Sequence, residues 1–249
     1  MLKKLIFLVL VMIPTFVFSQ IESIEQKPLQ NTIRYNLSKP TILGFGNIIF
    51  GYERIISETR SFSLDFGFNR MPAFDNEGNE NDMISLLPGG KNNGIHFSAD
   101  YRFYLKSENK FKAPRGVYIG PYYSFNTFNK GKNWNLTTTN FDGIVGTDLG
   151  IRYHTIGAEL GYQFQLSKRL VLDFVLFGPG IGFYKLDVDF NSTLDPEDSA
   201  LVLEHINELL SNKLPGFNTL IDGSGFEKTG TVKAGAFGYR LSINIGYRF

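Results

Sequence analysis

The sequence predicts an all-β protein: an eight-stranded antiparallel transmembrane β-barrel with one short helix in its last extracellular loop. Three observations lead to this prediction, namely segments of alternating apolar and polar residues, an amino-terminal export signal, and connections that alternate between short and long. Alternation with a period of two is the pattern of a β-strand that has one apolar and one polar face. An exported, aromatic-rich chain without a spanning helix is either a soluble all-β protein or a transmembrane barrel.

Residues 1–19 have the features of a secretory signal peptide. Lys3 and Lys4 precede an apolar stretch of 14 residues, which is shorter than the about 20 residues that a membrane-spanning helix needs. We expect cleavage after Ser19, which leaves one barrel domain over residues 20–249. The chain has no cysteine, so a lipid-anchored cysteine and disulfides are excluded. Without Lys3 and Lys4, 23 of the 25 basic residues remain, against 24 acidic residues. The chain therefore has no excess of basic residues that would indicate nucleic-acid binding.

Seven segments are predicted as strands from their alternation. They are 41–56, 60–69, 95–105, 115–126, 156–166, 169–177 and 239–249. A single-chain bacterial barrel has an even number of strands, so one more is needed. The segment NTIRYNL at 31–37 is the candidate, and it must then pair with the terminal strand 239–249 to close the barrel.

The polar face of these strands distinguishes a membrane barrel from a soluble one, because alternation alone fits both. Charged residues lie on that face in the middle of the strands: Asp65, Asp100, Arg102, Glu159, Asp173 and Arg240. They suit a narrow lumen that is lined or closed by ion pairs, while the Phe, Leu, Ile and Tyr residues of the other face suit lipid. A soluble β-barrel or sandwich stays the alternative fold.

One segment breaks the alternation. Ile151 and Tyr153 have the opposite parity to Ile156, Ala158 and Leu160. A slip of one residue exchanges the faces of a strand, so we expect a β-bulge near residues 154–156.

The connections divide into short turns and long loops. Residues 57–59, 106–115 and 167–168 are short or moderate, whereas 71–93, 129–147 and 191–233 are long, and the two kinds alternate. In a transmembrane barrel the long loops lie outside the cell, where they could bind an extracellular ligand.

The last long loop contains a predicted helix. Asp195 is placed to cap it and Pro196 to begin it, and Val202, Ile206 and Leu209 share one face. We expect this helix to pack over the barrel mouth or against neighbouring loops. A helix that binds a partner is the alternative.

No catalytic site, metal site or cofactor is expected. The acidic loop 75–82 has oxygen ligands that suit Ca²⁺, but its glycine is not where an EF-hand loop needs one, and a solvated loop is the preferred interpretation. The motif His96-Phe97-Ser98 resembles the His-x-Ser pair of outer-membrane lipid A deacylases. Both polar residues share the parity of Asp100, so we expect them to face the lumen, away from a lipid substrate.

Several short segments together resemble a known family. The leader, NTIRYNL, Tyr52-Glu53-Arg54, RGVYIGPYYSF and the terminal aromatic residue resemble small outer-membrane proteins of the OmpA-transmembrane and OmpX-like type. The resemblance implies an integral outer-membrane protein in contact with outer-membrane lipid and lipopolysaccharide. It also implies that the barrel-assembly machinery recognises Tyr247 and Phe249.

These observations favour a non-enzymatic outer-membrane β-barrel with a structural or surface-interaction role. Two alternatives stay open. One is a narrow pore or a passage for a hydrophobic ligand, and the other is a lipid A-modifying enzyme.

Overall fold

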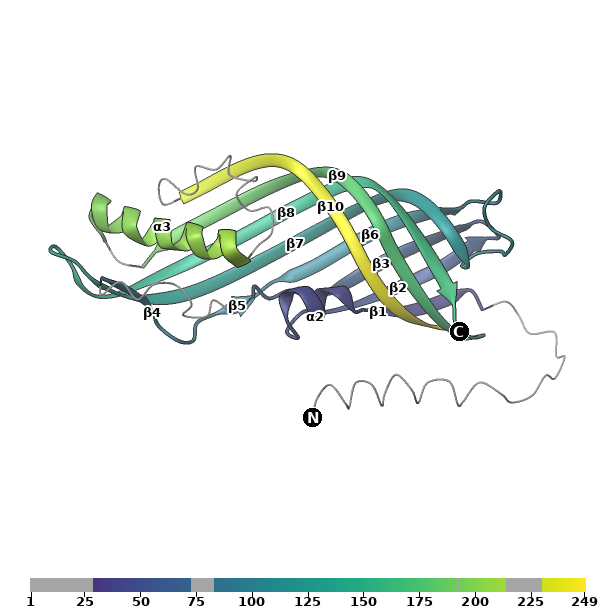
Figure 1. Cartoon of the computed structure of the whole chain (residues 1–249), viewed down its shortest axis with the longest axis horizontal. Helices are drawn as coiled ribbons and strands as arrows, with labels where there is room; N and C mark the ends of the chain where they lie inside the picture. Colours follow the sequence, from purple (N-terminus) through teal and green to yellow (C-terminus); the bar gives the residue numbers. More distant parts are fainter. Residues whose placement is uncertain (1–28, 73–82, 192, 214–229) are drawn as a thin grey trace.

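The computed structural model describes residues 29–72, 83–191, 193–213 and 230–249, and the architecture is mostly β. Ten strands form one antiparallel sheet: β1 (Asn31–Asn36), β2 (Ile48–Ser57), β3 (Arg60–Phe68), β4 (Ile84–Leu86), β5 (Asn92–Asn93), β6 (Ile95–Tyr104), β7 (Gly116–Thr137), β8 (Asp142–Gln165), β9 (Leu170–Phe190) and β10 (Gly230–Arg248). Two helices accompany them, α2 (Ser38–Leu43) and α3 (Pro196–Lys213). Figure 1 shows the strands as a long curved sheet with α3 at one end.

Eight of the strands close into a ring in the order β1, β2, β3, β6, β7, β8, β9, β10 and back to β1. Closure occurs between β1 and β10, where Ile33 lies opposite Tyr247 and Tyr35 opposite Ile245. The sequence-based predictions of eight ring strands, of a first strand within residues 31–37 and of its pairing with the terminal strand are therefore confirmed. The short strands β4 and β5 pair with β7.

In its closed part, the ring is apolar outside and polar inside. Large aromatic side chains point outward and are exposed, such as Phe66 at 57% and Phe237 at 70%, while Arg34, Arg102 and Asp173 are buried inside. This arrangement follows from the period of two, since successive side chains of a strand point to opposite faces.

Four strands extend far beyond the closed part of the ring. β7, β8, β9 and β10 have 22, 24, 21 and 19 residues, whereas β1, β2, β3 and β6 have 6 to 10. The prediction of a loop over 129–147 is wrong, because β7 and β8 remain paired up to Thr137 and Asp142. Parts of the other two predicted long loops are also strands: β4 and β5 lie within 71–93, and β10 begins at Gly230, within 191–233.

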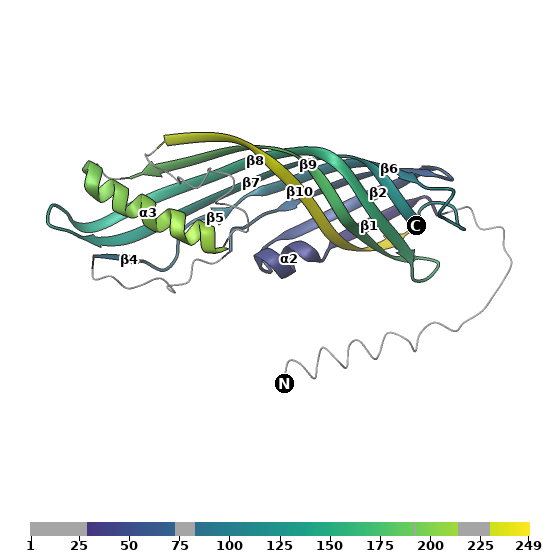
Figure 2. The same ribbon diagram turned by 45° about the horizontal axis from the view of Figure 1, so that its top comes forward.

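The helix α3 covers the inward side of these extended strands. Its residues Val202, Leu203, Ile206, Leu209 and Leu210 are buried against the inward side chains of the extended strands. That cluster includes Trp134, Leu136, Val145, Leu186 and Val188. Figure 2 shows α3 lying along this end of the sheet. Apolar burial of this kind offsets the cost of ordering a long hairpin.

The predicted start of α3 is also observed. The backbone amide of Asp198 donates to Asp195 Oδ1 at 2.9 Å, and Pro196 is the first helical residue. A side-chain oxygen before the helix satisfies one of the first unpaired amides.

A second helix was not predicted. α2 occupies residues 38–43, where we expected a turn and the beginning of a strand, and β2 starts only at Ile48. The Asn36 Oδ1 atom accepts hydrogen bonds from the Lys39 amide at 2.8 Å and from Ser38 Oγ at 3.0 Å. These local bonds compete with strand extension and turn the chain.

The predicted β-bulge near residues 154–156 is wrong. β8 pairs with β7 without a shift, and His154 lies opposite Phe125. The shift lies between Leu160 and Gly161, opposite an extra residue of β9, Leu176. Ile151 is buried because the ring interior is itself apolar at this level, where it joins the α3 cluster. The apolar residues of β8 therefore change from the outer to the inner face because the ring interior changes from polar to apolar, and the backbone pairing stays regular.

In the part of the chain that the structure describes, neither helix combines the length and the apolar composition needed to cross a membrane.

Candidate functional site: the ring interior

A cluster of charged side chains fills the closed part of the ring. It contains three arginines and five carboxylates: Arg34, Arg102, Arg240, Glu53, Asp65, Asp100, Glu159 and Asp173. Seven of the eight ring strands contribute at least one of these groups, and the remaining strand, β7, contributes Tyr118, which donates to Asp173. The cluster thus connects the entire wall across the interior.

Asp173 on β9 is the centre of the cluster. It accepts hydrogen bonds from Arg34 Nη1 at 3.1 Å, Arg102 Nη2 at 3.1 Å, the Tyr118 hydroxyl at 2.8 Å and Asn244 Nδ2 at 3.2 Å. Its side chain is fully buried. A buried carboxylate needs such a set of partners, because an unpaired charge in this environment is strongly unfavourable.

Arg102 on β6 is the most enclosed cation. Its Nε atom donates to Asp100 at 2.9 Å, and its Nη1 atom lies 3.6 Å from Glu53. Its guanidinium also stacks over the ring of Tyr118, 4.3 Å from the ring centroid. The planar guanidinium can satisfy several acceptors at once, which a lysine could not do.

Arg240 on β10 completes the cluster on the side of the extended strands. It lies 3.2 Å from Asp65, 3.1 Å from Asp100 and 3.1 Å from Glu159. Arg34 binds Asp65 from the other side at 2.9 Å. The interior of an eight-stranded ring is only wide enough for side chains to fill it, and here these ion pairs occupy it.

The structure brings all six lining residues named from the sequence into this one cluster, but two of its members were missed. Arg34 lies on the shortest ring strand, and Glu53 on a strand whose facing was ambiguous in the sequence. Their positions in the alternating pattern could have indicated that they face the interior. Arg34 alternates with Ile33 and Tyr35, and Glu53 alternates with Tyr52 and Arg54.

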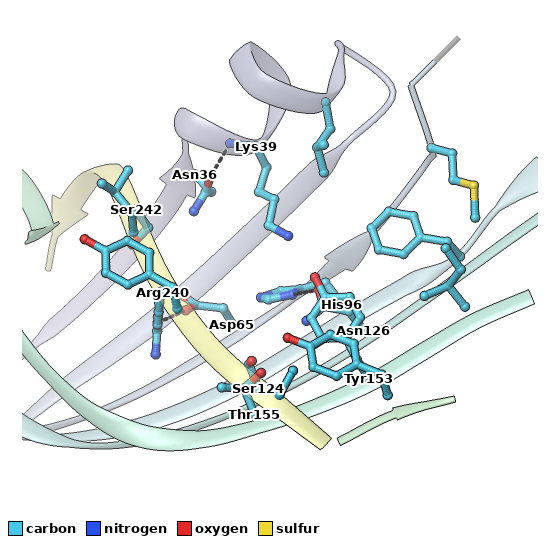
Figure 3. Close-up of a pocket in the computed structure, with 18 of the residues that line it drawn as sticks. Asn36, Lys39, Asp65, His96, Ser124, Asn126, Tyr153, Thr155, Arg240 and Ser242 are labelled. Carbon is cyan, nitrogen blue, oxygen red and sulfur yellow. Dashed lines mark hydrogen bonds and ion pairs between the residues drawn. The ribbon is translucent and has the colours of Figure 1, made fainter. Parts of the chain in front are cut away.

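A cavity of about 500 Å³ lies beside the cluster, toward α3. Arg240 and Asp65 line its floor, and Lys39 of α2 reaches into it, as Figure 3 shows. His96 and Asn126 form part of its wall, and the two are joined by a contact of 2.7 Å between Nδ1 and Oδ1. Apolar residues of the extended strands, among them Ile151 and Leu186, line the end that faces α3.

Comparison with known proteins places the chain in a family. The model of the family described as "Protein of unknown function (DUF3575)" matches residues 6–197. The chain belongs to the DUF3575 family.

A search of the curated proteins found no match to this DUF3575 chain. Among the solved structures, the crystal structure of a major outer membrane protein from Thermus thermophilus is similar to it. The two chains have 13% sequence identity and a TM-score of 0.39, and the alignment covers 88% of this chain and 98% of that one. A similarity at this level carries neither fold nor function over to the DUF3575 chain.

The DUF3575 chain places His96 and Ser98 inside the ring, at 8% and 1% exposure. Ser98 Oγ donates to Asp65 at 3.0 Å, whereas His96 contacts Asn126. Each residue of the motif therefore has its own partner, and neither points to the outer, apolar face. Across the described ranges, no group of three or more His, Asp or Glu side chains is arranged to hold a metal ion. The acidic segment 75–82 lies outside the described residues.

Tyr247 and Phe249 lie at the turn end of the DUF3575 chain and are about half exposed, at 49% and 48%. The Tyr247 hydroxyl accepts a hydrogen bond from Arg169 at 2.7 Å. Backbone bonds join Phe249 and Asn31 in both directions, at 2.9 and 3.2 Å. Both side chains face outward, where another molecule can reach them.

Proposed function

We propose that this protein is an integral outer-membrane β-barrel with a structural or surface-interaction role, no catalytic activity and a lumen closed by ion pairs. The observation that carries the proposal is the inverted polarity of the ring. Its interior holds eight charged groups, while the outside carries a belt of Phe, Leu, Ile and Tyr side chains. Apolar surface of this extent is unfavourable in water and suits the hydrocarbon core of a membrane.

The proposal includes an export route and an orientation. The leader of residues 1–19 would direct export, and cleavage after Ser19 would release the barrel. The short turns lie at the same end as Asn31 and Phe249, and the extended strands with α3 lie at the other. We place the turn end in the periplasm and the α3 end outside the cell, as in OmpX-like proteins.

The proposed partners follow from this orientation. Outer-membrane lipid and lipopolysaccharide would contact the apolar belt, and the assembly machinery would recognise Tyr247 and Phe249. The segments 71–93, 129–147 and 191–233 would present the β7–β8 hairpin and α3 to an extracellular ligand. No cofactor and no nucleic acid are part of the proposal.

Localisation and conductance test the proposal. We expect the expressed chain in the outer-membrane fraction of a Gram-negative host, resistant to extraction by carbonate or urea. In a planar lipid bilayer, we expect the purified protein to give no more current than a protein-free bilayer, because the ion pairs fill the lumen. Current steps in the wild type that disappear in Arg102→Ala or Arg240→Ala would contradict the closed lumen, and a soluble periplasmic chain would contradict the location.

A further inference from the structure

The wall of the ring has a seam beside the outer part of β10. β1 pairs with β10 only from Asn244 to Arg248, and the next backbone bond joins Leu37 N to Ile243 O at 2.8 Å. Within the described residues, no strand pairs with this edge of β10 before Asn244, where α2 lies beside it instead. Side chains rather than a ladder of backbone hydrogen bonds therefore close the wall here.

The cavity described above extends into this seam. Its lining includes residues of both faces of β10: Ala236, Arg240 and Ser242 of the inner face, and the exposed Phe237, Tyr239 and Leu241 of the outer face. Neighbouring side chains of a strand point to opposite faces. A cavity lined by both sets reaches the unpaired edge of β10, where the ring interior adjoins the apolar outer surface.

Lys39 lies at the inner end of this cavity and has no counterion among the described residues. Lys39 is half-buried and lines the cavity, and no carboxylate of the described residues forms an ion pair with its ammonium group. The carboxylate of Asp65 also lines the cavity, but Arg34, Arg240 and Ser98 already occupy it. An ammonium group shielded from water is unfavourable unless an anion joins it.

Further polar groups face the same space. His96 uses Nδ1 for Asn126, which leaves Nε2 without a partner among the described residues, and the side chains of Ser124 and Thr155 also line the cavity. The volume of about 500 Å³ is typical of a small-molecule site that combines apolar walls with a few polar groups.

We infer that this cavity binds a long-chain fatty acid, with its carboxylate at Lys39 and His96 and its alkyl chain passing through the seam along Phe237, Tyr239 and Leu241. A single free ammonium matches the single charge of a carboxylate. The arginine fork matches the geometry of a phosphate group, but the three arginines of the cluster are already occupied by carboxylates. The inference rests on the proposed function, since the seam delivers a lipid only if the apolar belt lies in a membrane.

Binding of radiolabelled palmitate tests the inference. The full-length mature protein is reconstituted in phosphatidylcholine nanodiscs, and protein-free nanodiscs provide the background. We expect saturable binding of one palmitate per chain. Hexadecanol, which has the same chain and a neutral head, should displace it at least tenfold less effectively than unlabelled palmitate. Equal displacement by hexadecanol, or no saturable binding, would overturn the inference, and this arm needs no variant.

Variants locate the head group. Lys39→Met should weaken palmitate binding at least tenfold, Lys39→Arg should retain it within about threefold, and Lys106→Met, at the turn end, should leave it unchanged. If Lys39→Met does not fold, as judged from its heat-dependent gel mobility, Ala236→Trp provides the second test, because it fills the cavity without altering its charge and should abolish binding. Wild-type binding in a folded Lys39→Met, or in Ala236→Trp, would refute the site.

Two further outcomes separate the possible failures. Displacement by palmitoyl lysophosphatidic acid at a lower concentration than by palmitate would assign the site to a phosphate head and overturn the carboxylate. A chain that is found in the outer membrane but does not bind palmitate refutes this inference alone, whereas a chain that is absent from the outer membrane refutes the proposed function.

Discussion

At the scale of single residues, the charged interior depends on mutual compensation. Asp173 accepts from both Arg34 and Arg102, and Asp100 lies against both Arg102 and Arg240. Each charge is thus shared between strands that are distant in the sequence. A buried ion pair does not by itself prove a gain in stability. Removing one partner is nevertheless destabilising, because it leaves the other charge buried without a counterion.

Arg102→Ala should therefore destabilise the fold. We expect the free energy of unfolding to fall by about 3–5 kcal/mol, because Asp100 and Asp173 each lose one of their two arginines inside the ring. Urea unfolding in detergent micelles, followed by heat-dependent gel mobility, measures the effect.

Arg152→Ala is the matched control for this variant. Arg152 pairs with Asp187 at 3.3 Å on the surface, with 53% of its side chain exposed. A surface pair of this kind contributes about 0–1 kcal/mol. An equal decrease in the free energy of unfolding in the two variants would show that the interior cluster contributes no more to stability than a surface ion pair.

At the scale of elements, the same strand meets two different interiors. β8 runs from the polar cluster at Glu159 to the apolar cluster at Ile151 and Val145 without any shift against β7. The real irregularity lies in β9, where Leu176 and Phe177 are both exposed, at 53% and 52%. Two adjacent outward side chains are the local sign of an extra residue in the strand.

The docking of α3 can be tested with the single tryptophan of the chain. Trp134 is buried in the cluster that α3 covers, and its Nε1 atom donates to Thr147 at 2.8 Å. Ile206→Asp places a charge in this cluster, so we expect α3 to detach and the Trp134 fluorescence to shift to the red. The ring should keep its heat-dependent gel mobility, because it closes without α3.

Glu204→Gln is the control on the same helix, since Glu204 is exposed. Its fluorescence should match the wild type. An unshifted spectrum in folded Ile206→Asp would contradict the packing of α3 described above.

At the scale of the whole molecule, the closure between β1 and β10 decides the architecture. The two strands stand at opposite ends of the described chain, and β1 has only six residues with which to hold β10. Closure also places Arg34 in the interior, so the shortest ring strand contributes one of the three arginines of the cluster.

A disulfide can test this closure, because the chain has no cysteine of its own. Ile33 and Tyr247 lie directly opposite each other and face outward, and opposite residues of an antiparallel pair have Cα atoms about 4.5–5.5 Å apart. That separation suits a disulfide. We expect the double variant Ile33→Cys/Tyr247→Cys, refolded in detergent so that the assembly machinery is not needed, to oxidise to one intramolecular disulfide, detected by non-reducing gel mobility and peptide mass.

The control pairs Ile33→Cys with Leu170→Cys. Leu170 lies opposite Tyr247 on β9, one strand further along the ring. Strands are spaced by about 4.8 Å, so this pair is too far apart and should stay reduced. A disulfide in the control but not in the test pair would contradict the register between β1 and β10.

The sequence is sufficient to predict the class of the fold, the eight ring strands, the pairing of the first with the last and the polar face that holds Asp65, Asp100, Arg102, Glu159, Asp173 and Arg240. These features depend on alternation along each strand, which is a local property of the chain. Knowledge of the tertiary packing was needed to establish the length of β7 to β10, the absence of the expected bulge, the positions of Arg34 and Glu53 in the cluster, and the seam beside α2. Each of these depends on what packs opposite a given residue: α3 makes apolar side chains inward-facing at one level of β8, and the short β1 leaves an edge of β10 uncovered.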